Sequence, residues 1–225
     1  LFTSYMKRFI PAVVDAKRLV DDGSLGTIMS TSIRAFQCWG DLWDGAPREG
    51  FFATPTGGKS EVVSRYGGGI LVCGGSHILD LIGHFLGRPN RVSASMHTPP
   101  GGDFDVQAAA LLETEKGVAH FEALAHPLDR IGFLKDGWDE RIEITGTKGR
   151  LEVLSSSWNE VESKGSLLIH YDNTSHCEKE YRYGPVSPFS AAIRTFCGAI
   201  DRRDTTIQSP VTGYDVDELI SCIYE

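Results

Sequence analysis

The sequence predicts an α+β fold in which one large, mostly antiparallel sheet carries its helices on one face. Segments typical of strands follow one another over residues 91–184, whereas helical apolar spacing is confined to segments before and after this stretch. Short turns that contain Lys-Gly join several of these strands, as in antiparallel hairpins. Strands and helices do not alternate strictly, which argues against a doubly wound parallel sheet.

The first elements are a helix and a strand. Apolar residues recur with helical spacing from Pro11, which suits a first turn, and Asp22-Gly23 is a typical helix end. Residues 27–36 (TIMSTSIRAF) alternate and are rich in β-branched side chains, which favours a strand. Residues 38–66 show no period and are predicted as a long loop, and such loops often bind ligands.

A second helix is predicted over residues 76–86, with Ser76 as its N-cap and with Gly87 and Pro89 as stop signals. Hairpin turns are expected at residues 115–117 and 147–149. The strand segments are 91–98, 106–126, 141–155, 166–172 and 179–184, and the closing helices are 188–201 and 213–225.

Composition excludes several classes of partner. The 22 basic and 30 acidic residues give a net charge of −8 without a basic block, so we expect no nucleic-acid partner. No run approaches the roughly 18 apolar residues needed to cross a bilayer, so we expect no membrane partner. The five cysteines are scattered and form no CxxC, which predicts free thiols in a reducing compartment, the cytoplasm.

The ends of the chain suggest a piece of a longer protein. The sequence starts at Leu1 without an initiator Met, and VDELISCIYE stops within a helical pattern. We therefore expect residues 1–225 to be one domain of a larger polypeptide. Any targeting segment would lie outside it.

The stretch GGGILVCGGSHILD, residues 67–80, combines five glycines with Cys73, His77 and Asp80. Its glycine spacing fits neither the dinucleotide fingerprint nor the P-loop. A metal site is disfavoured because His77 and His84 stand two helical turns apart, and no metal is predicted. A Cys73–His77 nucleophile, a plain polar helix edge and a histidine acting in acid–base chemistry remain open.

GGGILVCGGSHILDLIGHFLGRPNRVSA resembles the GGGxLxDxGxHxxD…LG-x-P-x-x-V stretch of the Gfo/Idh/MocA oxidoreductases, named for glucose–fructose oxidoreductase and inositol dehydrogenase. Three further segments resemble the family in the same order. They are YMKRFIPAVVDAKRLVDDGSLGTIMS, ERIEITGTKGRLEV and the closing FCGAID…TTIQSPVTGYDVDELISCIYE. The resemblance runs nearly from end to end.

The resemblance implies a C-terminal substrate-binding and oligomerisation domain over residues 1–225, with the N-terminal Rossmann dinucleotide-binding domain absent from this chain. The full-length protein would be an NAD(P)-dependent oxidoreductase acting on a sugar or polyol hydroxyl, with NAD or NADP as cofactor. The isolated fragment is expected to bind no cofactor and to be inactive.

Within this scheme His77 matches the catalytic base of the family and Asp80 matches the second motif aspartate. Cys73 replaces the first aspartate, and a thiol is mostly neutral at pH 7. The alternative function is therefore a non-catalytic, sugar-sensing or regulatory member of the same family.

Four further residues are candidates for substrate binding beside Cys73 and Asp80. Arg8 lies at the expected domain junction, where a structural salt bridge is the alternative role. Trp39 and Arg65 lie in the predicted long loop, where an aromatic plane suits a sugar face and an arginine suits hydroxyls. His126 stands at the predicted end of a strand, directly before a proline.

A homodimer through the sheet is also expected. Residues 108–112 carry small or apolar side chains in both phases of the strand, so the face without helices needs a cover of its own. A second copy of the chain would provide it, as the resemblance to the family also implies.

Overall fold

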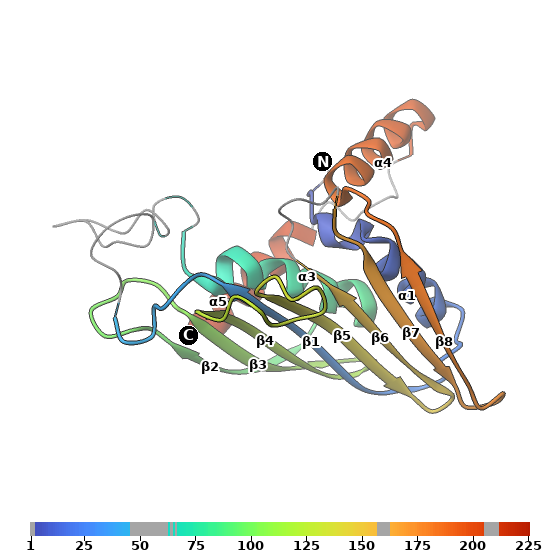
Figure 1. Cartoon of the computed structure of the whole chain (residues 1–225), viewed down its shortest axis with the longest axis horizontal. Coiled ribbons are helices and arrows are strands. Elements are labelled where there is room, and N and C mark those ends of the chain that lie inside the picture. The colour runs from blue at the N-terminus through green and yellow to red at the C-terminus, as the bar shows by residue number, and fades with distance from the viewer. Residues whose placement is uncertain (1–2, 46–62, 64, 66, 157–162, 205–211) are drawn as a thin grey trace.

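The computed structural model describes residues 3–45, 63, 65, 67–156, 163–204 and 212–225. Within these residues, eight strands form one sheet and the helices lie on one of its faces (Figure 1). The predicted α+β class is confirmed. The other face of the sheet carries no helix (Figure 1).

The sheet has the order β2-β3-β4-β1-β5-β6-β7-β8. The strands are β1 (Ile28–Cys38), β2 (Arg91–His97), β3 (Gln107–Thr114), β4 (Gly117–His126), β5 (Trp138–Gly146), β6 (Gly149–Ser155), β7 (Ser166–Asp172) and β8 (Cys177–Tyr183). Every neighbouring pair is antiparallel except β1 and β4, which run parallel. The carboxyl ends of β1 and β4 therefore meet at one edge of the sheet.

The helical elements are η1 (Met6–Phe9), α1 (Pro11–Asp21), η2 (Leu71–Gly75), α3 (Ser76–Leu86), α4 (Pro188–Arg202) and α5 (Thr212–Tyr224). Helix α1 packs on β6, β7 and β8, whereas α3 packs on β1 and β4, and α5 lies against α3 and β2. Helix α4 contacts chiefly η1 and rises away from the sheet (Figure 1).

The core lies between the sheet and these helices. Along β1 the side chains alternate, so that Ile33 and Ala35 are fully buried under the helices while Ser32 and Arg34 face the other side. Phe85 and Ile82 of α3 are fully buried above them. Burying each such large apolar side chain contributes about 1.5–3 kcal/mol, which holds the helix layer on the sheet.

The helix-free face of the sheet is largely polar. Arg34 and Asp139 pair across β1 and β5 at 2.7 Å, and Arg150 lies 2.8 Å from both Glu143 and Glu152. Beside these pairs, a hollow over β1 to β4 is lined by serines and by Leu111, which is 45% exposed. We call this surface the open face.

The hairpin turns agree with the predictions, whereas the predicted cap of the second helix does not form. Both Lys-Gly hairpins form, between β3 and β4 and between β5 and β6. The predicted N-cap at Ser76 is wrong, because the backbone is already helical from Ile70 and the Ser76 hydroxyl donates to the carbonyl of Cys73. Glycines before Ser76 let this earlier turn lie close to the sheet, so the helix needs no cap there.

The predicted long loop, residues 38–66, is described only in part. Cys38 still belongs to β1, and Val63 and Arg65 have helical backbone, so the prediction is wrong at both ends. Residues 46–62 lie outside the described residues.

Candidate functional site

The glycine-rich stretch forms a π-helical turn, η2, that runs directly into α3. Such π-turns are rare and occur frequently at functional sites. A Cβ atom at Gly69 would lie 2.0 Å from the backbone oxygen of Asp105, and one at Gly68 would lie 2.6 Å from the Tyr224 hydroxyl. These glycines therefore serve a close backbone approach.

Asp105, which directly precedes Val106 before β3, holds this turn in place. Its buried carboxylate accepts hydrogen bonds from the backbone N–H of Gly69 at 3.0 Å and of Leu71 at 2.7 Å. The Tyr224 hydroxyl donates a third at 2.7 Å. The start of η2 is thus bound through one side chain to the end of α5. Sequence reasoning missed Asp105, because its partners lie more than 30 residues away.

The end of η2 lies directly on the sheet. A Cβ atom at Gly74 would stand 2.7 Å from the side-chain amide of Gln37, and one at Gly75 would stand 3.1 Å from the Phe121 ring. Gln37 is the penultimate residue of β1. This contact brings Cys73 and the start of α3 to the carboxyl ends of the parallel pair β1 and β4.

His77 is half-buried at this place, on the first turn of α3. Its Nδ1 is buried and has no hydrogen-bond partner among the described residues. The ring stands edge-on to Tyr5, with centroids 5.6 Å apart. Burial, followed by the positive charge of Lys7, lowers the pKa of His77 to about 4. The imidazole is therefore neutral at pH 7 and free to accept a proton.

Cys73 is half-buried about one turn before His77. Burial raises the pKa of its thiol, and this effect outweighs the opposing charge of Lys7. A thiolate–imidazolium pair would require both shifts in the opposite direction. The directions of the two pKa shifts therefore disfavour a Cys73–His77 nucleophile, one of the alternatives left open by the sequence.

A buried ion pair lies beside these two residues. The Lys7 ammonium on η1 is within 2.6 and 2.5 Å of the two carboxylate oxygens of Glu140 on β5, and both side chains are almost fully buried. Gln37 donates to Glu140 at 3.4 Å and accepts from the Trp39 indole at 3.3 Å. Sequence reasoning missed the pair, since no local pattern marks residues 133 positions apart.

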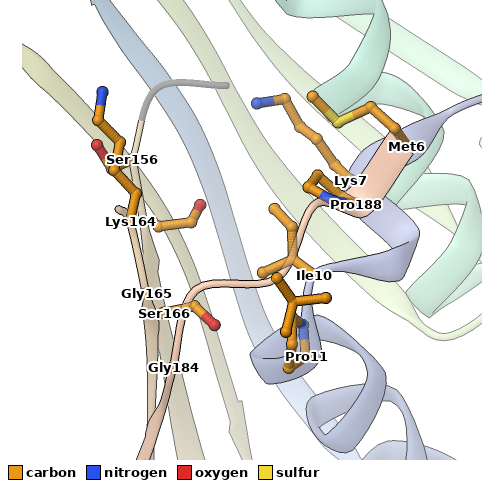
Figure 2. Close-up of a pocket in the computed structure, with 12 residues that line it drawn as sticks. Met6, Lys7, Ile10, Pro11, Ser156, Lys164, Gly165, Ser166, Gly184 and Pro188 are labelled. Atoms are coloured by element: carbon orange, nitrogen blue, oxygen red, sulfur yellow. The ribbon is translucent and has the colours of Figure 1, made fainter. Parts of the chain in front are cut away.

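Figure 2 shows a small pocket that Lys7 and Ile10 line on one side and Lys164 and Ser166 line on the other. The charged groups here are already paired, because Lys164 lies 3.0 Å from Asp136 and Lys7 binds Glu140. We assign no ligand to this pocket.

Arg8 and Asp80 bind each other. Two guanidinium nitrogens of Arg8 donate to the two oxygens of Asp80, at 2.7 and 2.6 Å. Asp80 is almost fully buried, and burial raises its pKa although Arg8 acts in the opposite direction. The pair joins η1 to α3 and so places His77 relative to Lys7. The predicted contacts of Arg8 and Asp80 with substrate stay predictions.

The remaining candidates for substrate binding are Trp39, His126 and Arg65. Trp39 is half-buried and follows β1 directly. His126 ends β4 beside Cys38; its Nδ1 accepts from the backbone of Leu128 at 3.0 Å, and burial lowers its pKa. Arg65 is exposed. The structure thus brings Cys73, His77, Trp39 and His126 toward one sheet end, where the Trp39 backbone N–H donates to the His126 carbonyl at 3.1 Å. A substrate role for any of them stays a prediction.

His84 occupies a different environment from His77. It lines a groove between α3 and α5, and burial together with Arg8 and Lys17 lowers its pKa to about 3. Within the described ranges, no three histidine, cysteine or carboxylate side chains gather as a metal ion would require.

The comparison with protein families decides the assignment. The model described as the GFO/IDH/MocA C-terminal domain matches residues 13–152. The chain belongs to the Gfo/Idh/MocA family. The resemblance seen in the sequence is thereby confirmed. A search of the curated proteins found no match.

Solved structures share the fold of this Gfo/Idh/MocA chain. An oxidoreductase domain protein from Kribbella flavida matches with a TM-score of 0.74 at 23% identity, over 98% of this chain and 62% of its own. Levoglucosan dehydrogenase, in complex with NADH and levoglucosan, matches at 0.73 and 20% identity with the same coverage. The aldose–aldose oxidoreductase from Caulobacter crescentus, complexed with glycerol, matches at 0.70 and 20%, over 98% and 59%.

The Gfo/Idh/MocA chain thus spans only about three fifths of the length of these solved relatives, 62% or 59%. In the part of the chain that the structure describes, no helix has the length and apolarity of a membrane span.

Proposed function

We propose that this chain is the substrate-binding and oligomerisation half of an NAD(P)-dependent oxidoreductase that acts on a sugar or polyol hydroxyl. The dinucleotide-binding half lies outside the chain. The observation that carries the proposal is a neutral, half-buried His77 where β1 and β4 end, with an Nδ1 that has no hydrogen-bond partner in the described part of the chain. Family membership and the sugar complexes of the solved relatives support the choice of substrate.

The described residues do not fit a dinucleotide by themselves. The glycines that a phosphate loop would need are used for packing against Asp105 and Gln37. Among the described strands, β1 and β4 are the one neighbouring parallel pair, and the chain connects them through β2 and β3 and not through a single crossover helix. A dinucleotide held by the other half would supply the hydride acceptor or donor for the substrate carbon.

His77 is suited to move the hydroxyl proton. In the oxidation direction, the neutral imidazole accepts the proton of the substrate hydroxyl, and in the reverse direction the imidazolium returns it. The nearby Lys7 ammonium disfavours a lasting positive charge on the ring, so the proton is readily passed on. The neutral Cys73 thiol offers the substrate a weak hydrogen bond only.

The test uses the complete polypeptide that carries this chain. His77→Ala is expected to lower kcat for a sugar substrate about 100- to 10,000-fold, the usual contribution of a general base, with little change in dinucleotide affinity. His120→Ala, on the open face, is the matched control and should retain activity. Survival of activity in the His77 variant would remove the proposed base.

The absence of a cofactor site in this half is tested on the 225-residue chain. Titration with NADH or NADPH, followed by nucleotide fluorescence, should show no micromolar binding. Micromolar affinity would contradict the division into two halves.

The second candidate function is a sugar-sensing, non-catalytic member of the family, and Cys73 favours it. A motif carboxylate would hold a charge beside His77, whereas the Cys73 thiol is kept neutral by burial. A glycine fingerprint followed by Glu-Lys-Pro in the upstream sequence would favour the enzyme, and loss of that lysine would favour the sensor.

We also propose that two copies associate through the open face. Its hollow, lined by small side chains and Leu111, has no covering helix. Sheet-to-sheet association would bury it.

A further inference from the structure

Lys7 and Glu140 form an ion pair in the interior of the fold. Their side chains are 4% and 3% exposed, and the ammonium lies 2.6 and 2.5 Å from the two carboxylate oxygens. Removing two charges from water costs free energy that their mutual attraction often fails to return. Exchange of such a pair for uncharged side chains of similar size is therefore often neutral or stabilising. The stability of the fold alone does not account for this pair.

The Lys7 ammonium is held in place by the neighbours of Lys7 along the chain. Arg8, the next residue, binds Asp80 of α3 through two hydrogen bonds at 2.7 and 2.6 Å. The ring of Tyr5, the residue before η1, stands edge-on to His77 of α3. The short helix η1 is thus fixed to α3 on both sides of Lys7, while Lys7 itself reaches β5.

Glu140 is connected in turn to the glycine-rich turn η2. Gln37 of β1 donates to one of its carboxylate oxygens at 3.4 Å, and the Ser155 hydroxyl donates to the other at 3.4 Å. A Cβ atom at Gly74 of η2 would stand 2.7 Å from the Gln37 amide. The carboxylate of the pair is therefore tied, through Gln37, to the turn that precedes His77.

We propose that Lys7 and Glu140 are positioning residues for the candidate base His77, which they keep in its proton-accepting form, and that the fold itself does not require them. This inference rests on the proposed function, because it assigns the pair a role toward the base of the proposed reaction. Lys7 supplies the charge, and Glu140 fixes the ammonium at its place beside η2 and α3. Neither residue needs to touch the substrate.

The electrostatics agree with this assignment. Lys7 is the member of the pair that acts on His77, where its charge adds to burial in lowering the pKa. The same charge opposes the effect of burial on the pKa of Cys73. A positive charge beside an imidazole disfavours the imidazolium, so the ring stays ready to accept a proton.

The other titratable groups around Lys7 and His77 are neutral, paired or exposed. Tyr5 and Cys73 keep their protons because their pKa values are raised, Arg8 pairs with Asp80, Asp105 binds η2 and Tyr224, Asp217 of α5 is exposed, and Lys164 pairs with Asp136 across the pocket of Figure 2. The charge of Lys7 is therefore the one that a variant has to remove.

The experiment uses the complete polypeptide that carries this chain and the double variant Lys7→Met/Glu140→Gln, which removes both charges at similar side-chain size. NMR titration of labelled histidines, with His77→Gln to identify the signal, should give a His77 midpoint about one unit above that of the wild type. The melting temperature should stay within about 4 °C of the wild type or rise. Lys7→Arg retains the charge and should titrate as the wild type does.

A matched control removes a second ion pair between β1 and β5. Arg34 and Asp139 pair at 2.7 Å on the open face, one residue from Glu140, and are 33% and 10% exposed. The double variant Arg34→Met/Asp139→Asn should leave the His77 midpoint unchanged. Glu140→Gln alone leaves a buried ammonium without its partner and should lower the melting temperature by about 6 °C or more.

An unchanged His77 midpoint in the folded Lys7→Met/Glu140→Gln variant would overturn the inference. Loss of the fold in this variant, or a fall in melting temperature as large as that of Glu140→Gln alone, would also overturn it, because the pair would then be structural. A raised midpoint together with an equal shift of the acidic limb of kcat/KM supports both proposals. If the midpoint rises but the wild type turns over no sugar, the role of the pair stands and the proposed function fails.

Discussion

Burial and a neighbouring ammonium act in the same direction on His77. Both disfavour the imidazolium, so the pKa falls to about 4 and the ring is neutral over the whole physiological range. Burial raises the pKa of Cys73 and keeps its proton on the sulfur. Because the Cys73 thiol carries no charge, the positive charge of Lys7 is the strongest electrostatic influence on His77.

Cys73→Asp should raise the pKa of His77. A carboxylate about one turn before the ring favours the imidazolium, and an opposite charge at this range shifts a pKa by about one unit or more. NMR titration of the His77 ring measures the change. Cys73→Ser, which adds no charge, is the control and should leave the midpoint near that of the wild type. An unchanged midpoint in the aspartate variant would show that residue 73 does not affect His77.

The lowered pKa values also predict acid sensitivity. The pKa values of His77 and His84 are lowered from 6.5 to about 4 and about 3, so below pH 6.5 the unfolded state binds protons that the folded state does not. Stability is therefore lost as the pH falls from 6.5, by up to about 2 kcal/mol per histidine at pH 5. Urea unfolding at pH 7.5 and pH 5 measures it. His84→Gln should flatten the dependence.

Single residues were predictable where a local motif marks them. His77, Cys73 and Asp80 stand in one fourteen-residue stretch, and the structure places that stretch at a sheet edge. Lys7 and Glu140 were missed because their contact depends on the packing of η1 over β5, which no local spacing encodes. The structural alternative for Arg8, a junction salt bridge, is present as the pair with Asp80.

Among the elements, η2 shows most directly how glycine permits a close contact. Its start is clamped by Asp105, and its end rests on Gln37 and Phe121. A side chain at Gly69 or Gly74 would push η2 away from the sheet and carry His77 with it.

Gly69→Ala should destabilise the protein by several kcal/mol, because its Cβ would overlap the backbone of Asp105 at 2.0 Å. Gly83→Ala is the matched control. It lies in α3 with nothing within 4 Å of the added Cβ, so it should stabilise the protein by about 0.5–1 kcal/mol. Thermal unfolding of both variants measures the difference. Equal stabilities would mean that η2 does not depend on this contact.

Element type was predictable wherever turn chemistry and period agree. The two Lys-Gly hairpins illustrate this, since both strand period and turn residues point to the same structure. The bounds of α3 agree with the predicted residues 76–86, but a cap was wrongly predicted at this boundary, because Ser76 is a favoured cap residue whereas the glycines before it continue the helical backbone against the sheet. Tertiary packing decided this boundary.

In the whole molecule, the helices pack on one face of the sheet, whereas the open face has no helix over it. Its ion pairs between Arg34 and Asp139 and around Arg150 offer charged partners at the rim, and the hollow near Leu111 offers apolar area. This combination suits a polar subunit interface.

Leu111→Glu should shift the proposed dimer to a monomer, because a charge would be buried at the centre of the interface. Light scattering at tens of micromolar measures the mass. Val14→Glu, an exposed apolar position on the helix side, should leave it unchanged. A wild-type chain that is already monomeric at this concentration would contradict the dimer.

The class of fold was predictable, because runs of strands between helices allow few architectures. The order of the strands was not. Residues of β1 pair with residues of β4 and β5 that lie 88 to 118 positions further along the chain, and no feature of residues 27–36 indicates these neighbours.

The central position of β1 has a consequence for how the chain folds. A strand near the N-terminus whose partner strands lie far along the chain gives the fold a high contact order, and a high contact order slows folding. On the ribosome, β1 would have to wait unpaired until β4 had emerged, and its second edge would stay open to other chains until β5 followed. We therefore expect synthesis of this fold to depend on chaperones more than its size suggests.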